Sequence, residues 1–201
     1  MKTLFLVRHA KSDWPANVSD FDRPLSERGH RDAPKMAEFL KSKNVEIDTF
    51  VSSPAKRAIT TCRYFAEIFE NDHIRKVEKL YNASTVDFLE VIENLSDEIE
   101  NVALFSHNNG ITYFANSLTN ENIMHMPTCA VVGFKINTET WQDFLKAEKE
   151  FFQRRGYRET RRDFSRAVFR LSARVVARRT GTPYPAHPEI ATDWRNVLLC
   201  A

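Results

Sequence analysis

The sequence predicts an α/β fold in which a mostly parallel central sheet is covered by helices on both faces. Three observations support this prediction. Short, almost wholly apolar segments alternate along the chain with longer segments of helical periodicity, the pattern of a sheet buried on both faces. The 201 residues are 42% apolar and 28% charged, which is sufficient for a globular core. No apolar run reaches the length of a membrane span.

The predicted strands are brief, and the first of them is almost wholly apolar. They cover residues 3–8, 49–52, 74–77, 102–105 and 130–136. The predicted helices carry apolar residues three and four positions apart, and they cover residues 26–43, 55–69, 85–95 and 111–118. Ser26 is the expected N-cap of the first helix, and Pro34 either lies in its first turn or bends it. Residues 141–152 fit a final strand and a helix equally well.

Charge divides the chain near residue 150. Residues 1–150 hold 11 lysines and 7 arginines against 23 acidic residues, a net charge of −5. Residues 151–201 hold 11 arginines, no lysine and four acidic residues, a net charge of +7. This change predicts a first domain over residues 1–152 and a basic C-terminal extension over residues 153–201.

The basic extension allows three interpretations. Residues 157–179 fit a helix with an apolar stripe beside arginines that recur every four residues. Such a helix binds an anionic membrane, nucleic acid or an acidic partner, or it packs its apolar stripe against the first domain. The abrupt loss of lysine is also what a shifted reading frame or a fused sequence produces. The sequence leaves these three open.

Basic side chains follow three of the predicted strands. Arg8 and His9 follow the first strand, Arg57 comes shortly after the second, and His107 follows the strand over residues 102–105. Because the carboxyl ends of parallel strands meet at one edge of a sheet, we expect these side chains to converge there. Guanidinium groups match phosphate oxygens, and a histidine attacks phosphorus through its free nitrogen. The sequence therefore predicts a phosphoryl-transfer site at this edge.

Four sequence blocks at these positions resemble the histidine phosphatase superfamily, the phosphoglycerate mutase-like proteins. They are LVRHAKS at residues 6–12, DRPLSERG at 22–29, SSPAKRA at 52–58 with the two threonines that follow, and LFSHNNG at 104–110. The short connections and PTCAV at residues 127–131 are most similar to the phosphohistidine phosphatase (SixA-like) branch. The resemblance covers roughly residues 1–152 and implies the same α/β fold.

The resemblance also implies roles for individual residues. His9 would be the nucleophile that becomes phosphorylated, while Arg8, Arg57 and His107 would bind the phosphoryl group and stabilise the transition state. Asn108 would add a hydrogen bond to the substrate. No metal-ligand cluster or nucleotide-binding motif occurs in the sequence, so we expect neither a metal nor a cofactor.

The general acid is where the sequence departs from this pattern. Larger members of the family supply a carboxylate from a segment beyond the second helix, and residues 80–84 contain none here. Asp20 and Asp22 are the available substitutes. Alternatively, no acid is needed, because the imidazole that leaves a phosphohistidine requires less protonation than an alkoxide.

The sequence therefore predicts a metal-independent phosphatase that acts through phospho-His9, with phosphohistidine in proteins as the favoured substrate. A phosphatase for small phosphate esters, with Asp20 or Asp22 as the acid, is one alternative. A phosphate-recognition module without turnover is another. Only four apolar residues precede Arg8, too few for a signal peptide, so we expect a cytoplasmic protein. The expected partner is a phosphorylated protein or small molecule, with nucleic acid or another anionic partner only through the basic extension.

Overall fold

The computed structural model describes residues 1–155 and the side chains of residues 1–152. The predicted helix over residues 157–179, and the whole of the basic extension after Arg155, lie outside the described residues. In the described part, six strands form one mixed sheet in the order β3-β2-β4-β1-β5-β6. The strands are β1 (Lys2–Arg8), β2 (Thr49–Ser52), β3 (Ile74–Lys76), β4 (Asn101–Ser106), β5 (Val131–Ile136) and β6 (Lys149–Arg155).

The pairing confirms the mostly parallel sheet. Strands β3, β2, β4 and β1 are mutually parallel, whereas β5 runs antiparallel to β1 and to β6. The segment left undecided between strand and helix ends in β6, which pairs with β5 and continues to Arg155. The boundary after residue 152 and the separate status of the extension stay predictions.

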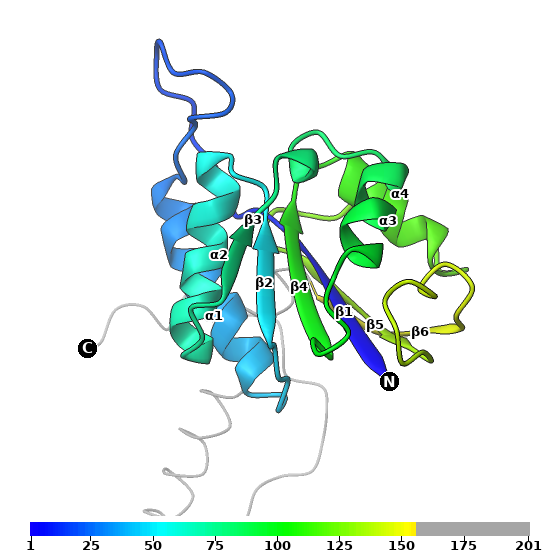
Figure 1. The fold of residues 1–201 in the computed structure, drawn as a ribbon. Coiled ribbons are helices and arrows are strands. Elements are labelled where there is room, and N and C mark those ends of the chain that lie inside the picture. The colour runs from blue at the N-terminus through cyan, green and yellow to red at the C-terminus, as the bar shows by residue number, and fades with distance from the viewer. Residues whose placement is uncertain (156–201) are drawn as a thin grey trace, which may run out of the picture. The chain divides into compact units, whose positions relative to one another are not determined.

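Helices cover both faces of the sheet (Figure 1). They are α1 (Glu27–Lys41), α2 (Lys56–Phe69), α3 (Thr85–Glu93) and α4 (Gly110–Ser117), with a 3₁₀ turn, η1 (Glu78–Leu80), between β3 and α3. The sequence did not predict η1. Helices α1 and α2 pack on one face, and α3, α4 and η1 pack on the other.

The apolar strand β1 is explained by this two-sided burial. Leu4 and Leu6 belong to the core beneath α3 and α4, while Phe5 and Val7 belong to the core beneath α1 and α2. Alternate residues of a strand point to opposite faces, so a strand covered on both sides must be apolar at every central position. Both cores position the same strand, and with it the residues that follow its carboxyl end.

The first helix begins as predicted and runs through its proline. Ser26 Oγ accepts a hydrogen bond from the backbone N–H of Gly29 at 3.2 Å, which confirms it as the N-cap. Pro34 lies inside α1 rather than in its first turn, and the helix continues to Lys41. The long loop between β1 and α1 projects beyond the carboxyl ends of the parallel strands (Figure 1). This loop brings Asp20 and Arg23 to the predicted site.

Candidate active site

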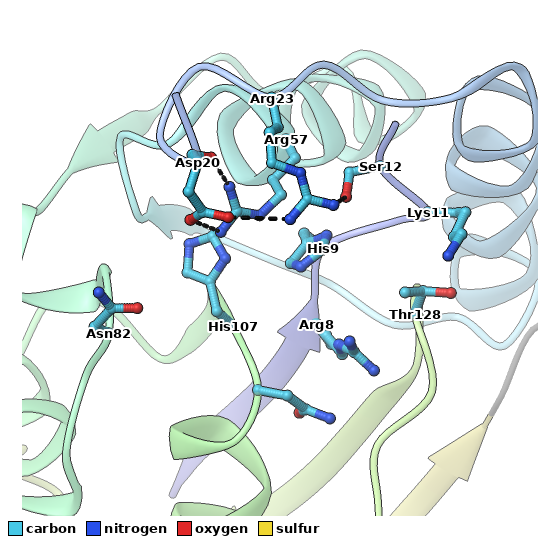
Figure 2. Close-up of a pocket in the computed structure, with 11 residues that line it drawn as sticks. Arg8, His9, Lys11, Ser12, Asp20, Arg23, Arg57, Asn82, His107 and Thr128 are labelled. Atoms are coloured by element: carbon cyan, nitrogen blue, oxygen red, sulfur yellow. Dashed lines mark hydrogen bonds and ion pairs between the residues drawn. The ribbon is translucent and has the colours of Figure 1, made fainter. Parts of the chain in front are cut away.

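A cavity of about 310 Å³ opens at the carboxyl edge of the parallel strands. It collects side chains from the end of β1, the first turn of α2 and the loops that follow β1, η1 and β4 and precede β5 (Figure 2). Six of the seven predicted site residues line it, namely Arg8, His9, Asp20, Arg57, His107 and Asn108. The convergence of Arg8, His9, Arg57 and His107 was expected from the strand ends. Asp22 is the exception: it is exposed and accepts a hydrogen bond from Ser19 Oγ at 2.6 Å.

His9 is held in one tautomer. Its Nδ1 lies 2.7 Å from the carbonyl oxygen of Ala10. A carbonyl can only accept, so Nδ1 carries the proton and Nε2 keeps its lone pair. The backbone of His9 is fixed as well, because its N–H donates to Ser106 O and its carbonyl accepts from the N–H of Cys129, both at 3.1 Å. His9 is thus a buried imidazole with a free basic nitrogen.

The charge state of His9 follows from its surroundings. Burial lowers its pKa well below the ordinary value of 6.5, and the neighbouring His107, Arg57 and Arg8 lower it further. The hydrogen bond to Ala10 opposes this shift without cancelling it. His9 is therefore neutral at physiological pH, which is the form that can attack phosphorus.

Arg57 and the end of β1 are joined by one threonine. Thr61 Oγ1 donates to the carbonyl oxygen of Arg57 at 2.7 Å and accepts from the backbone N–H of Ala10 at 3.0 Å. The hydroxyl of this fully buried side chain therefore both donates and accepts a hydrogen bond. This contact explains the spacing of Arg57 and Thr61 in the sequence: one turn of α2 separates them, and the threonine ties that turn to the residue after His9.

Arg8 is fixed from the other side of the cavity. Its Nη1 donates to the carbonyl oxygen of Met126 at 2.7 Å and lies 3.1 Å from Nε2 of His125. Nε has no hydrogen-bond partner among the described residues, and neither has Nε of Arg57. Burial and the charge of Arg57 both lower the pKa of Arg8. Two guanidinium groups close enough to repel each other make this an anion site.

His107 lies beside His9 with its own partner. The two ring centroids are 5.1 Å apart, and His107 Nε2 lies 2.8 Å from Ser53 Oγ. Ser53 can donate its hydroxyl proton to Nε2, and in that tautomer the buried, unpartnered Nδ1 is a donor to a phosphoryl oxygen. Burial, with Arg57 next in importance, lowers the pKa of His107 to about 3.

Asp20 is the carboxylate at the cavity. Its Oδ2 accepts from Arg57 Nη2 at 2.9 Å and from the Tyr81 hydroxyl at 2.8 Å, and its Oδ1 accepts from Arg23 Nη1 at 3.0 Å. Burial opposes its ionisation, but the hydrogen bonds from Tyr81, Arg23 and Arg57 prevail and lower the pKa to about 2. Asp20 is therefore ionised at neutral pH and holds no proton to give a leaving group.

Tyr81 is a residue of this network that sequence reasoning missed. It follows η1, which is anchored by the hydrogen bond from Ser106 Oγ to Leu80 O at 2.7 Å. Its hydroxyl reaches Asp20, and its ring packs edge-on against His107 with centroids 5.5 Å apart. No local pattern marks the tyrosine as functional, because its partners come from distant parts of the chain.

Five further residues line the cavity without having been predicted. They are Lys11, Ser12, Arg23, Asn82 and Thr128. Lys11 and Ser12 lie in the first sequence block and Arg23 in the second, so membership of a block was the available signal. The predicted Asn108 donates from its amide to the carbonyl oxygen of Met126 at 3.0 Å and accepts from Thr112 at 2.9 Å. These contacts hold the loop that also binds Arg8.

Two features of the described residues bear on other functions. Among them, no group of three or more histidine, cysteine, aspartate or glutamate side chains is arranged to hold a metal ion. No helix in this part of the chain is long and apolar enough to cross a membrane.

Comparison with known proteins identifies first the fold of the chain and then its family. The structure matches one from Agrobacterium tumefaciens assigned as the phosphohistidine phosphatase SixA, with a TM-score of 0.66 and 25% identity. The match covers 77% of this chain and 97% of that one. The class is thus the phosphoglycerate mutase-like α/β proteins, as the sequence predicted.

Sequence comparison reaches the same class. The signature of the histidine phosphatase superfamily (branch 1) matches residues 4–87. Uncharacterized protein ML1117 of Mycobacterium leprae is 31% identical over 117 residues, which cover 56% of this chain and 71% of that protein. Uncharacterized protein Rv1276c of Mycobacterium tuberculosis is 32% identical over 101 residues, half of this chain but only 62% of that protein's length. The chain belongs to the histidine phosphatase superfamily.

Proposed function

We propose that the chain is a phosphatase that works through a phosphorylated His9 and takes phosphohistidine in proteins as its substrate. The observation that carries the proposal is the tautomer of His9. Its Nδ1 proton is committed to Ala10 O at 2.7 Å, and the basic Nε2 is left beside two guanidinium groups. A site that only binds phosphate has no need of a free nucleophilic nitrogen.

The reaction has two steps. The lone pair of His9 Nε2 attacks phosphorus as the bond from phosphorus to the leaving nitrogen breaks, and that nitrogen takes a proton from solvent. Water then attacks the phosphorylated His9, breaks its N–P bond and releases inorganic phosphate. Arg8 and Arg57 neutralise the charge on the transferring oxygens in both steps, which is the main demand of phosphoryl transfer, and Nδ1 of His107 donates a hydrogen bond to one of these oxygens.

The preference for phosphohistidine follows from Asp20. This carboxylate lines the cavity but accepts three hydrogen bonds from side chains, and its pKa is lowered to about 2. It cannot protonate an alkoxide leaving group. An imidazole leaves more readily, because its conjugate acid has a pKa of roughly 6.5, far below that of an alcohol.

The test is phosphate release from two peptides of the same sequence, one with phosphohistidine and one with phosphoserine. Wild type and Asp20→Asn are assayed with a metal chelator present. We expect both proteins to hydrolyse only the phosphohistidine peptide. Hydrolysis of phosphoserine by wild type but not by Asp20→Asn would replace the proposal with an ester phosphatase that uses Asp20 as its acid. Phosphopeptide binding without hydrolysis would make the protein a recognition module.

A further inference from the structure

The cavity holds more positive charge than one phosphoryl group can neutralise. Its formal charges are those of Arg8, Lys11, Arg23 and Arg57 against the single carboxylate of Asp20, which leaves +3. The two histidines add nothing at neutral pH, since their pKa values are lowered by burial and by the arginines. A phosphoryl group carries at most about two negative charges. One positive charge is therefore unmatched when the substrate's phosphoryl group is bound.

Lys11 carries the positive charge that the phosphoryl group leaves unneutralised. Asp20 already pairs with Arg57 and Arg23 at 2.9 and 3.0 Å. Arg8 lies next to His9, so its charge serves the phosphoryl group. Lys11 is exposed at the edge of the cavity, and its ammonium makes no ion pair or hydrogen bond with any residue of the described part. Half-buried Thr128 lines the same cavity.

The backbone of Lys11 is nevertheless rigidly held. Its carbonyl oxygen accepts from the N–H of Ser26 at 2.9 Å and from Ser26 Oγ at 3.1 Å. A Cβ on Gly29 would lie 2.1 Å from that oxygen, so only glycine allows this approach of α1. The lysine is thus presented from a fixed position, two residues after His9, and its side chain lines the cavity on the side of Thr128 (Figure 2).

We propose that Lys11 binds a second anionic group of the substrate, and that in a phosphohistidine protein this group is an acidic side chain close to the phosphohistidine. The phosphohistidine part of this statement rests on the function proposed above. The general part of the statement, that Lys11 binds a second anionic group beside the phosphoryl group, does not rest on that function. Lys11 in this role determines specificity and takes no part in bond breaking.

Binding tests the general part without any turnover. The probes are 3-phosphonopropionate and propylphosphonate, which share a phosphonate and a three-carbon chain and differ by one carboxylate. We expect wild type to bind 3-phosphonopropionate about fivefold more tightly, the size expected of a partly exposed charge pair. In Lys11→Gln this preference should vanish while propylphosphonate binds within about twofold of wild type, and Lys11→Arg should retain part of it.

The outcomes separate the alternatives. Equal affinity of wild type for the two probes would overturn the proposal. The proposal would also be overturned if Lys11→Gln lowered the affinity for both probes equally, because Lys11 would then act on the phosphoryl group itself. Lys76→Gln, which removes an exposed lysine of β3, is the matched control for net charge and should behave as wild type. Retained propylphosphonate binding also verifies that Lys11→Gln is folded.

Hydrolysis tests the substrate assignment. Two phosphohistidine peptides are compared, one with acidic neighbours and one with neutral neighbours. We expect wild type to favour the acidic peptide about fivefold in kcat/KM, mostly through KM, and Lys11→Gln to lose this preference. Equal hydrolysis of both peptides by wild type would overturn the acidic-neighbour assignment. If neither peptide is hydrolysed, the proposed function fails, and the binding experiment still decides the role of Lys11.

Discussion

The floor and the rim of the cavity are built in different ways. The floor consists of Arg8, His9, Arg57 and His107, and the last three are at most 7% exposed. The rim consists of Lys11, Asp20, Arg23, Asn108 and Thr128, which come from loops and are half-buried or exposed. The floor residues follow strand ends or open a helix, and backbone or buried hydroxyl groups hold them.

This difference separates two tasks. Attack on phosphorus requires neutral imidazoles and close guanidinium groups, and burial at the sheet edge provides both. Recognition of the rest of a substrate requires groups that can reach solvent, and the rim provides those. We therefore expect changes in the floor to affect the reaction or the stability of the fold, and changes in the rim to affect mainly which substrate is used.

The largest effect should come from His9, the nucleophile proposed for the floor. His9→Asn removes the basic Nε2 and should lower kcat on phosphohistidine by at least about a thousandfold, while phosphate still binds. Phosphate release in a single-turnover assay and phosphate affinity by calorimetry measure the two effects. His73→Asn, which changes an exposed histidine outside the cavity, is the matched control. Near-normal turnover by His9→Asn would remove the nucleophile assignment.

The next effect concerns pH and the two floor histidines. Their pKa values are lowered in the folded protein, to about 3 for His107, so the unfolded chain binds more protons as pH falls through 6.5. Stability contributed by their neutral forms is present above 6.5 and lost below it. Between pH 7.5 and 5.5 the free energy of unfolding should fall by about 1.4 kcal/mol because of His107, and His9 should lower it further in the same direction.

Urea denaturation at the two pH values measures this effect. The variant with both His9→Asn and His107→Asn provides the comparison, because it lacks both titrating groups. Its stability should change less than that of wild type over the same range. An equal change in the two proteins would mean that the floor histidines do not carry the pH dependence.

A smaller effect should follow from loosening the floor. Thr61→Val preserves the shape of the side chain but leaves the buried N–H of Ala10 without its acceptor. We expect the free energy of unfolding to fall by about 1–3 kcal/mol. Thr60→Val loses a bond to the carbonyl oxygen of Lys56 on a half-buried side chain and should cost less. Equal losses in the two variants would show that the tie between α2 and β1 is unimportant.

The smallest effects should come from the two loop carboxylates, Asp20 and Asp22. Asp20→Asn keeps only one of the two acceptor oxygens and removes the charge that positions Arg57, so kcat/KM should fall by roughly threefold to tenfold with an unchanged pH profile. Asp22→Asn should change little, because Asp22 lies outside the cavity lining. A general acid would behave differently: its loss lowers the rate by about 10²–10⁴ and removes a limb of the pH profile.

The sequence predicted the floor far better than the rim. The apolar pattern predicted the strands of the sheet, and the sequence blocks placed Arg8, His9, Arg57 and His107 near the carboxyl ends of these strands. These two signals were enough to predict that the four side chains lie together. The rim residues could not be predicted in the same way, because their positions depend on the conformation of loops. Asp20 and Asp22 look alike in the sequence, yet only Asp20 lines the cavity, and it accepts hydrogen bonds from Arg57 and Tyr81. Nothing local distinguishes the two carboxylates.

The sequence by itself therefore determined the sheet, its two covered faces and the four basic side chains at its edge. These depend on periodic apolar burial and on the rule that parallel strands end at one edge, which are local or nearly local properties. Only the tertiary structure decided the tautomer of His9, the ionised state of Asp20 and the free ammonium of Lys11. The tautomer of His9 depends on the side-chain conformation that reaches the carbonyl oxygen of the next residue, Ala10. The charge state of Asp20 depends on which distant segments meet, and its partners Arg57 and Tyr81 lie 37 and 61 positions away along the chain.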